Sequence, residues 1–288
     1  MSKMRAGFIG MGDIGLPMAK NVVTKGFETT VCGHVRRQPI EEMVALGAKE
    51  SPHPKGVAEN SDAVIIMVQN DKQAEEVIFG NNGLMEGLHD GAGIILMGTF
   101  APAFCRRVES EGKPKNIDVL DGPVVGARMG AAAGTLGISV GGDPHVVERY
   151  RPLIETMGTI TYCGLLGMGQ IVKLSNNICA TLNAWVLYEA MNWGIANGGD
   201  EKTLIEHIKI GSGNSFTAQN WEWIKSMFTD PPPPTYYVGV KDMNHVLEIG
   251  TDLRLPCYFT ALAAERLKGP PPQLLEGPLT TEWSERKD

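Results

Sequence analysis

The 288-residue chain has no block of basic residues, and its formal net charge is −7. Nucleic acids and anionic membranes both select clustered lysine and arginine, so neither is expected as a partner. No apolar run is long enough to cross a membrane. The N-terminus passes from Met1 almost directly into a short apolar stretch and shows no signal-peptide pattern. We therefore expect a cytoplasmic protein.

Paired cysteines are also missing. The odd number and wide spacing of the five cysteines argue against a disulfide framework and against a zinc site. They are Cys32, Cys105, Cys163, Cys179 and Cys257. The six histidines lie in separate segments without the paired spacing of metal ligands, so no metal is expected. A hydrophobic content of 43% and a charged content of 20% are ordinary for a globular enzyme.

The first half of the chain alternates short apolar runs with helix-like stretches. Alternation of this kind predicts a mostly parallel sheet with helices packed on its faces. The apolar runs are continuous, as strands covered on both sides require. The expected strands are 6–10, 29–33, 63–68, 93–98, 117–124, 134–142 and 160–164, and the early helices are 16–26 and 38–48.

The second half lacks strand signals after about Gly164. Residues 170–196 are expected to form one long, largely apolar helix that is central to a second domain. The expected helices that follow it are 200–210, 218–227, 240–250 and 258–268. The proline run at 230–234 must be a loop, because proline cannot continue a helix.

A glycine ladder stands between the first expected strand and the first expected helix. In this context the first glycine allows a tight turn and the second lets the backbone approach a pyrophosphate. The third permits close packing of helix on strand, and the free N–H groups at the helix start face the phosphates. The ladder predicts dinucleotide contacts at Gly10, Met11, Gly12, Asp13, Ile14 and Gly15. A glycine-rich turn without a ligand is the alternative.

These patterns together indicate the fold class. We expect an α/β protein with a Rossmann-type dinucleotide-binding domain at 1–164. An all-helical second domain is expected at 165–288.

The segment after the second expected strand bears on the choice of cofactor. An acid there would hold the adenosine ribose of NAD, but the stretch reads VCGHVRR and contains none. His34 lies at this place, followed by Arg36 and Arg37. Guanidinium groups pair well with a 2′-phosphate, so NADP is favoured over NAD. The alternative is that both arginines are ordinary surface charges.

Four separated stretches carry a resemblance to a known family. They are GFIGMGDIGLPMAKN, DGPVVGARMGAAAGTL, GMGQIVKLSNN and GVKDMNHVLE. In this order and at these separations they resemble the β-hydroxyacid dehydrogenases, which include 3-hydroxyisobutyrate dehydrogenase and glyoxylate or succinic semialdehyde reductases. The resemblance covers nearly the whole chain. It implies a small-molecule substrate, a homodimer or homotetramer, and a role for the helical domain at 165–288 in substrate binding and oligomerisation.

The resemblance also implies roles for individual residues. Lys173 matches the catalytic lysine of the family, and Asn177 matches its substrate-contacting asparagine. The substrate-binding loop corresponds to Gly122, Pro123, Val124, Val125 and Gly126. Further cofactor contacts correspond to Val68, Gln69, Thr99 and Lys241.

The chemistry of the reaction fits a lysine at position 173. Lys173 and Asn177 are four residues apart and share one helix face, so both can reach a single small ligand. A hydride transfer between nicotinamide and a carbinol carbon needs a proton transfer at the oxygen, which a lysine can perform. The predicted function is an NAD(P)-dependent oxidoreductase acting on a β-hydroxyacid-like alcohol or its aldehyde or ketone. The alternative for Lys173 alone is a solvated helix charge.

The sequence also departs from the family. The substrate loop usually reads D-A-P-V-S-G-G, and here Val125 replaces the serine that helps to hold a substrate carboxylate. Arg128 could supply a replacement charge or lie at the surface. Four tryptophans are core residues or widen an apolar pocket for an atypical substrate: Trp185, Trp193, Trp221 and Trp223.

Two other functions remain open. Imine reductases that resemble this chain commonly replace the lysine, so the retained Lys173 favours alcohol–carbonyl chemistry. A non-catalytic nucleotide-binding module would need neither Lys173 nor Asn177.

Overall fold

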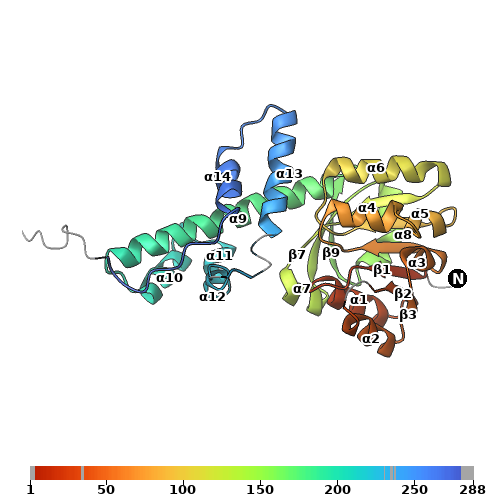
Figure 1. The fold of residues 1–288 in the computed structure, drawn as a ribbon, viewed down its shortest axis with the longest axis horizontal. Coiled ribbons are helices and arrows are strands. Elements are labelled where there is room, and N and C mark those ends of the chain that lie inside the picture. The colour runs from red at the N-terminus through yellow and green to blue at the C-terminus, as the bar shows by residue number, and fades with distance from the viewer. Residues whose placement is uncertain (1–3, 34–35, 230, 234–235, 237, 280–288) are drawn as a thin grey trace, which may run out of the picture. The chain divides into compact units, whose positions relative to one another are not determined.

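The computed structural model describes residues 4–279, except residues 34, 35, 230, 234, 235 and 237. The chain divides into two compact units, residues 1–173 and residues 174–288, and each is described by itself. The first unit contains a sheet with helices, and the second is built from helices (Figure 1). The expected α/β fold with a helical C-terminal region is confirmed.

One sheet organises the first unit. Its strands are β1 (Ala6–Ile9), β2 (Thr29–Cys32), β3 (Lys49–Ser51), β4 (Ala63–Ile66), β5 (Gly93–Leu96), β6 (Asp118–Asp121), β7 (Val124–Val125), β8 (Leu136–Gly141) and β9 (Gly158–Gly164). The order is β3-β2-β1-β4-β5-β6-β8-β7, and β9 pairs with β8. The first six strands in this order are parallel, whereas β8 is antiparallel to β6 and β7. From β1 the chain first adds strands on one side (β2 and β3) and then on the other (β4 to β6). Doubly wound sheets bind dinucleotides at such a switch point, which lies here between β1 and β4.

Helices cover both faces of this sheet. They are α1 (Gly15–Thr24), α2 (Gln38–Ala45), α3 (Pro54–Glu59), α4 (Asp71–Phe79), α5 (Leu84–Gly87), α6 (Pro102–Gly112), α7 (Ala127–Ala133) and α8 (Pro144–Ile154). Strand β4 shows why its sequence is continuously apolar: Ala63 and Ile65 enter one core cluster, and Val64 and Ile66 enter the other. All four side chains are fully buried. Burying each large aliphatic side chain stabilises the fold by about 1.5–3 kcal/mol.

Several elements differ from the sequence expectation. Strand β3 was not predicted, because its sequence KES is short, polar and largely exposed at the sheet edge. Helix α4 was not predicted either, since only Ala74 and Ile78 of its nine residues are buried. The expected strand 117–124 is divided into β6 and β7, because Pro123 lies between them and has no N–H to donate to a neighbouring strand.

The second unit is helical throughout its described part. Its elements are the continuation of α9 (Met168–Ala196), then α10 (Glu201–Ile210), α11 (Phe216–Gln219), α12 (Trp221–Lys225), α13 (Val238–Asp252) and α14 (Tyr258–Arg266). The helix expected at 218–227 is instead the two short helices α11 and α12. One hydrophobic core of the second unit includes Leu187, Met191, Ile205 and Trp221. Of the described helices, none combines the length and apolar character that a membrane span needs.

Candidate active site

The glycine ladder forms a tight turn between β1 and α1. Gly10 has φ +105°, and a side chain on it would overlap the carbonyl oxygen of Met67. A side chain on Gly15 would overlap the carbonyl oxygen of Gly10. In contrast, a Cβ on Gly12 would meet no atom within 4 Å. A side chain therefore does not fit at the first or the third glycine, whereas the space beside the second glycine is empty. This space allows a pyrophosphate to approach the backbone.

The end of β4 lies beside this turn. Met67 donates its N–H to the carbonyl oxygen of Ile9 at 2.8 Å. Val68 follows, and its nitrogen is 3.2 Å from the position that a Cβ on Gly10 would take. Gln69 donates its N–H to the side chain of Gln73 at 2.9 Å. The structure thus brings Val68 together with the glycine turn at the predicted dinucleotide crevice.

A small pocket lies at the end of β2. Its volume is about 210 Å³, and it is lined by Gly33, Arg36, Arg37, Ile40, Glu50, Ser51 and Pro52. His34, which the sequence placed at this cofactor site, lies outside the described residues. Arg37 donates two hydrogen bonds to the carboxylate of Glu50, one of them at 2.8 Å. The two predicted arginines therefore lie in one pocket, with an acid that the sequence did not indicate.

The loop after β5, which carries Thr99, is held from two sides. The buried side chain of Gln170 donates to the carbonyl oxygen of Gly98 and accepts from the N–H of Phe100, both at 3.0 Å. Asp71 accepts the N–H of Ala101 at 3.2 Å. Thr99 is thus fixed at the carboxyl edge of the sheet, where a nicotinamide contact was predicted. Neither Gln170 nor Asp71 was singled out from the sequence.

Asp121, the last residue of β6, fixes the start of α9. Its carboxylate is fully buried and accepts the N–H groups of Gly167 at 2.6 Å and Gln170 at 2.7 Å. Burial raises the pKa of Asp121 to about 6, although the backbone hydrogen bonds act in the opposite direction. A side chain on Gly169 would overlap the carbonyl oxygen of Ser139, so only glycine fits there.

This anchor has a consequence for the predicted catalytic residue. Lys173 lies three residues after Gln170, which is about one helical turn. The buried end of β6 therefore sets the helix turn that carries Lys173. The sequence did not single out Asp121 as an anchor. Its place as the first residue of the DGPVVG stretch is the sequence feature that could have indicated its importance.

The predicted substrate loop continues from Asp121 into β7. Val125 pairs with Gly137 of β8, and a Cβ on Gly137 would lie 2.8 Å from a methyl carbon of Val125. The valine side chain therefore packs over a glycine. Gly126 has φ +122°, and Ala127 has φ +52°, where the family pattern has a second glycine. A left-handed conformation costs a non-glycine residue about 1–2 kcal/mol.

The other residues discussed from the sequence differ in their burial. Gly122 and Pro123 are buried, and Arg128 is exposed on α7. Trp185 and Trp221 belong to the helical core. Trp193 and Trp223 are exposed.

In the second unit, Asn177 and Lys241 meet at a buried acid. The amide of Asn177 donates to Asp242 at 2.6 Å, and the ammonium of Lys241 lies 2.9 Å from the other oxygen of Asp242. The Asp242 side chain is only 2% exposed. It therefore fixes the orientation of two residues that the resemblance assigned to the substrate and the cofactor.

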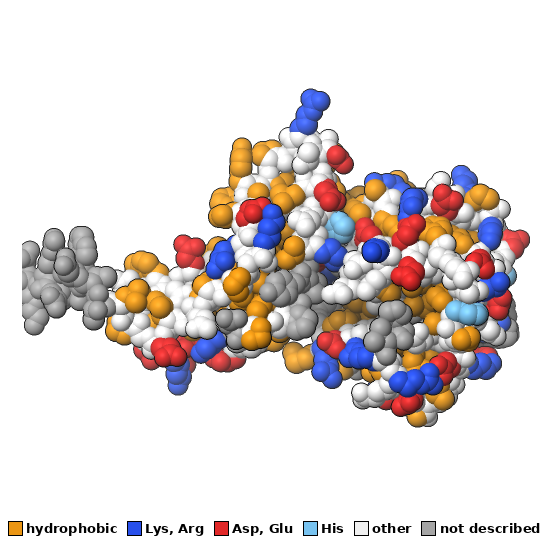
Figure 2. Space-filling view, viewed as in Figure 1, with side chains coloured by type: hydrophobic (Ala, Val, Ile, Leu, Met, Phe, Trp, Pro, Cys, Tyr) orange, Lys and Arg blue, Asp and Glu red, His pale blue; other side chains and the backbone are white. Residues whose placement is uncertain are grey.

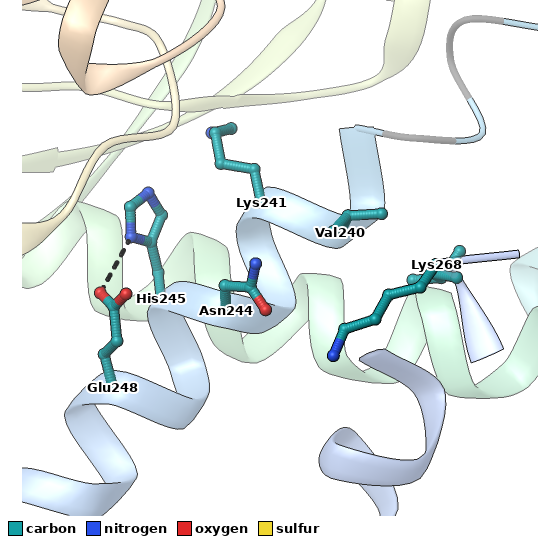
Figure 3. A pocket seen from close by; sticks show the side chains of 7 residues that line it. Val240, Lys241, Asn244, His245, Glu248 and Lys268 are labelled. Carbon is teal, nitrogen blue, oxygen red and sulfur yellow. Dashed lines mark ion pairs between the residues drawn. The ribbon is translucent and has the colours of Figure 1, made fainter. Parts of the chain in front are cut away.

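A second pocket opens beside Lys241. Lys241, Asn244 and His245 project from α13, and Lys268 follows α14 (Figure 3). Glu248 lies 3.8 Å from the His245 ring nitrogen. The volume is about 610 Å³, and Val240 and Leu267 complete the lining. The four tryptophans line neither this pocket nor the one at the end of β2.

The fold and the open glycine turn define a dinucleotide-binding protein of the doubly wound class. Comparison with known families identifies it further. Residues 5–167 match the NAD binding domain of 6-phosphogluconate dehydrogenase. Residues 167–273 match the NAD-binding domain of NADP-dependent 3-hydroxyisobutyrate dehydrogenase. The chain belongs to the β-hydroxyacid dehydrogenase family, as its sequence motifs indicated.

Individual relatives agree with this assignment. The chain is 34% identical to 2-hydroxy-3-oxopropionate reductase of Escherichia coli, over 91% of this chain and 89% of the relative. It is 32% identical to the NAD-dependent L-serine dehydrogenase of Pseudomonas aeruginosa, over 81% and 78% of the two chains. The crystal structure of 3-hydroxyisobutyrate dehydrogenase from Salmonella typhimurium has a TM-score of 0.82 at 21% identity, covering 92% of this chain and 93% of that one.

Imine reductases are less similar in structure. One from Myxococcus stipitatus has a TM-score of 0.64 at 15% identity, covering 92% of this chain and 93% of that one. The family match and the relatives named above show that the chain is an oxidoreductase of the hydroxyacid dehydrogenase type with a nicotinamide dinucleotide cofactor.

Proposed function

We propose that the protein prefers NADP and interconverts a β-hydroxyacid-like alcohol and its aldehyde or ketone, with Lys173 as the general acid and base. One observation carries this proposal: Asp121 ties the start of α9 to the carboxyl end of β6. The glycine turn after β1 and Thr99 after β5 lie at the same edge of this parallel sheet. This supports a position of Lys173 close to the edge at which dinucleotides bind.

The roles of the residues follow from their chemistry. The nicotinamide supplies the hydride in reduction and accepts it in oxidation. The ammonium of Lys173 donates a proton to the carbonyl oxygen in reduction, and its neutral amine accepts that proton in oxidation. Asn177 is four residues further along α9, and its amide is held by Asp242. Asn177 can therefore hydrogen-bond a substrate oxygen without adding charge.

The preference for NADP is supported by the pocket at the end of β2. Two guanidinium groups lie in that pocket, and the stretch that would carry the ribose-binding acid contains none. A planar guanidinium can bind a phosphate through two parallel hydrogen bonds. The second half of the chain also matches a domain described for an NADP-dependent enzyme.

The identity of the substrate depends on Val125. A valine that packs over Gly137 offers no hydrogen-bond donor to a carboxylate. We therefore infer that the substrate is larger or less acidic than a short hydroxycarboxylate.

A substrate panel tests both the reaction and the substrate class. The purified protein is mixed with NADPH or NADP⁺ and with short hydroxycarboxylates, uncharged alcohols, their carbonyl forms, and cyclic imines. We expect turnover of alcohol–carbonyl pairs, with uncharged members among the best. Turnover of short hydroxycarboxylates alone would contradict the inference from Val125. Turnover of imines alone would contradict the proposed reaction.

The helical unit supports a further part of the proposal, association into a homodimer or homotetramer. Large apolar side chains are exposed on it, and Figure 2 shows such groups over α14 and toward the far end of α9. The exposed large apolar side chains of this unit include Val186, Trp193, Phe216, Tyr258, Phe259 and Leu262. Extended apolar patches of this kind mark interaction surfaces.

The oligomeric state can be measured directly. Size-exclusion chromatography with light scattering is expected to give the mass of at least two chains. The variant Leu262→Asp should shift the protein toward a single chain, whereas Glu265→Asp on the same helix should not. A wild-type mass of one chain would contradict the expected assembly.

A further inference from the structure

The pocket at the end of β2 contains an acid that comes from the neighbouring strand. Glu50 belongs to β3, where it pairs with Val31 of β2. Its carboxylate accepts hydrogen bonds from both terminal nitrogens of the Arg37 guanidinium. This two-point contact is the geometry that a guanidinium also uses for a phosphate. Glu50 therefore occupies the donors with which Arg37 would bind an anion.

The two arginines of the pocket differ in their partners. Arg37 is bound to Glu50 and also lies 3.6 Å from Glu41. Arg36 makes no hydrogen bond or ion pair to any of the residues that the structure describes. The pKa of Glu50 is lowered by its hydrogen bonds to Arg37, so the carboxylate is ionised at neutral pH. The lining of the pocket thus carries two positive charges and one negative charge, which leaves one net positive charge.

We propose that Glu50 is a specificity-determining residue for the dinucleotide. It holds Arg37 away from the ligand, leaves Arg36 as the arginine for the 2′-phosphate, and so keeps the preference for NADP over NAD low. This inference rests on the proposed use of the pocket for the adenosine ribose. A pocket with two arginines can then still accept NAD, because only one of them is available to the ligand.

The variant Glu50→Gln tests the inference. Glutamine keeps the volume of the side chain but removes the charge, so Arg37 loses its two-point ionic contact and keeps only the longer, exposed contact with Glu41. The net positive charge of the pocket lining rises from one to two. The contact is partly exposed, with the side chain of Arg37 at 61% and that of Glu50 at 32%, and it contributes little to stability. The variant should therefore fold normally.

The readout is the dissociation constant of NADP⁺ and of NAD⁺, measured by isothermal titration calorimetry on the full chain. In Glu50→Gln, NADP⁺ should bind about tenfold more tightly, while NAD⁺ changes by less than about twofold. In Arg36→Ala, NADP⁺ should bind about tenfold more weakly, again with little change for NAD⁺. The double variant Arg37→Ala/Glu50→Gln restores one net positive charge and should return to the wild-type ratio.

A matched control is available at the same sheet edge. Glu28 pairs with Lys49, the neighbour of Glu50 in β3, and Glu28 does not line the pocket. Glu28→Gln should leave both dissociation constants unchanged.

The outcomes separate this inference from the proposed function. If the wild-type protein binds neither dinucleotide, the proposed function is wrong, and the role of Glu50 is wrong with it. If it binds both, but Glu50→Gln leaves the ratio of the two constants within about twofold, only the role of Glu50 is overturned. An unchanged ratio in Arg36→Ala would also overturn it, because Arg36 would then not bind the phosphate.

Discussion

Replacing Lys173 by alanine is expected to lower turnover by about a thousandfold, because general acid–base catalysis by a positioned group contributes about 10²–10⁴. The affinity for the dinucleotide should change little, since Lys173 belongs neither to the glycine turn nor to the lining of the pocket at the end of β2. Turnover is measured with NADPH and the best substrate of the panel, and cofactor affinity by calorimetry.

Two further variants distinguish proton transfer from mere positive charge. Lys173→Arg keeps the charge but cannot release a proton at working pH, so it should be nearly as inactive as the alanine variant. Lys202→Ala removes an exposed lysine from α10 and should have no effect. Substantial activity in Lys173→Arg would show that charge alone suffices, and full activity in Lys173→Ala would exclude Lys173 from the mechanism.

The parts of this site that the sequence predicts are those with local causes. Gly10 and Gly15 are required where they stand because a side chain would overlap backbone oxygens within the same turn or the adjoining strand end. Strand β4 is predicted from its apolar run because all four of its side chains are covered. Such demands leave a pattern in adjacent residues, and the sequence alone displays it.

The parts that the sequence did not predict depend on contacts between distant residues. Arg37 and Glu50 are 13 positions apart, and Asp121 and Gln170 are 49 apart. Nothing in the neighbourhood of Glu50 indicates that β3 will form or that its side chain will reach an arginine at the end of β2. The resemblance to a family identified Lys173, but the buried acid that anchors its helix became visible only with the fold.

Replacing Asp121 by asparagine should lower turnover by about a hundredfold, because small displacements of a catalytic group have effects of this size. Asparagine has one oxygen that can accept, so either Gly167 or Gln170 loses its acceptor at the start of α9. Lys173, one turn further on, then loses its fixed position. The dissociation constant of the dinucleotide should change much less than turnover.

A helix cap elsewhere in the same unit provides the control. Asp143 precedes α8 and accepts the N–H groups of His145 and Val146, but it is exposed. Asparagine is as good as aspartate at such a position. Asp143→Asn should therefore leave turnover unchanged. Equal losses in the two variants would show that turnover responds to helix caps in general and not to the anchor of α9.

The raised pKa of Asp121 also predicts how stability depends on pH. The pKa is about 6 in the folded protein against an ordinary value of 3.8, so the folded state binds this proton more tightly than the unfolded state. The stabilisation that results is present at low pH and is lost as pH rises through about 6. Between about pH 5 and pH 7.5, the contribution of Asp121 to the free energy of unfolding should fall by about 1 kcal/mol. Asp121→Asn lacks this contribution, so urea unfolding should show that the free energy of wild type minus that of the variant decreases over this interval. A difference that stays constant or increases with pH would mean that the buried carboxyl does not hold its proton in the way its surroundings require.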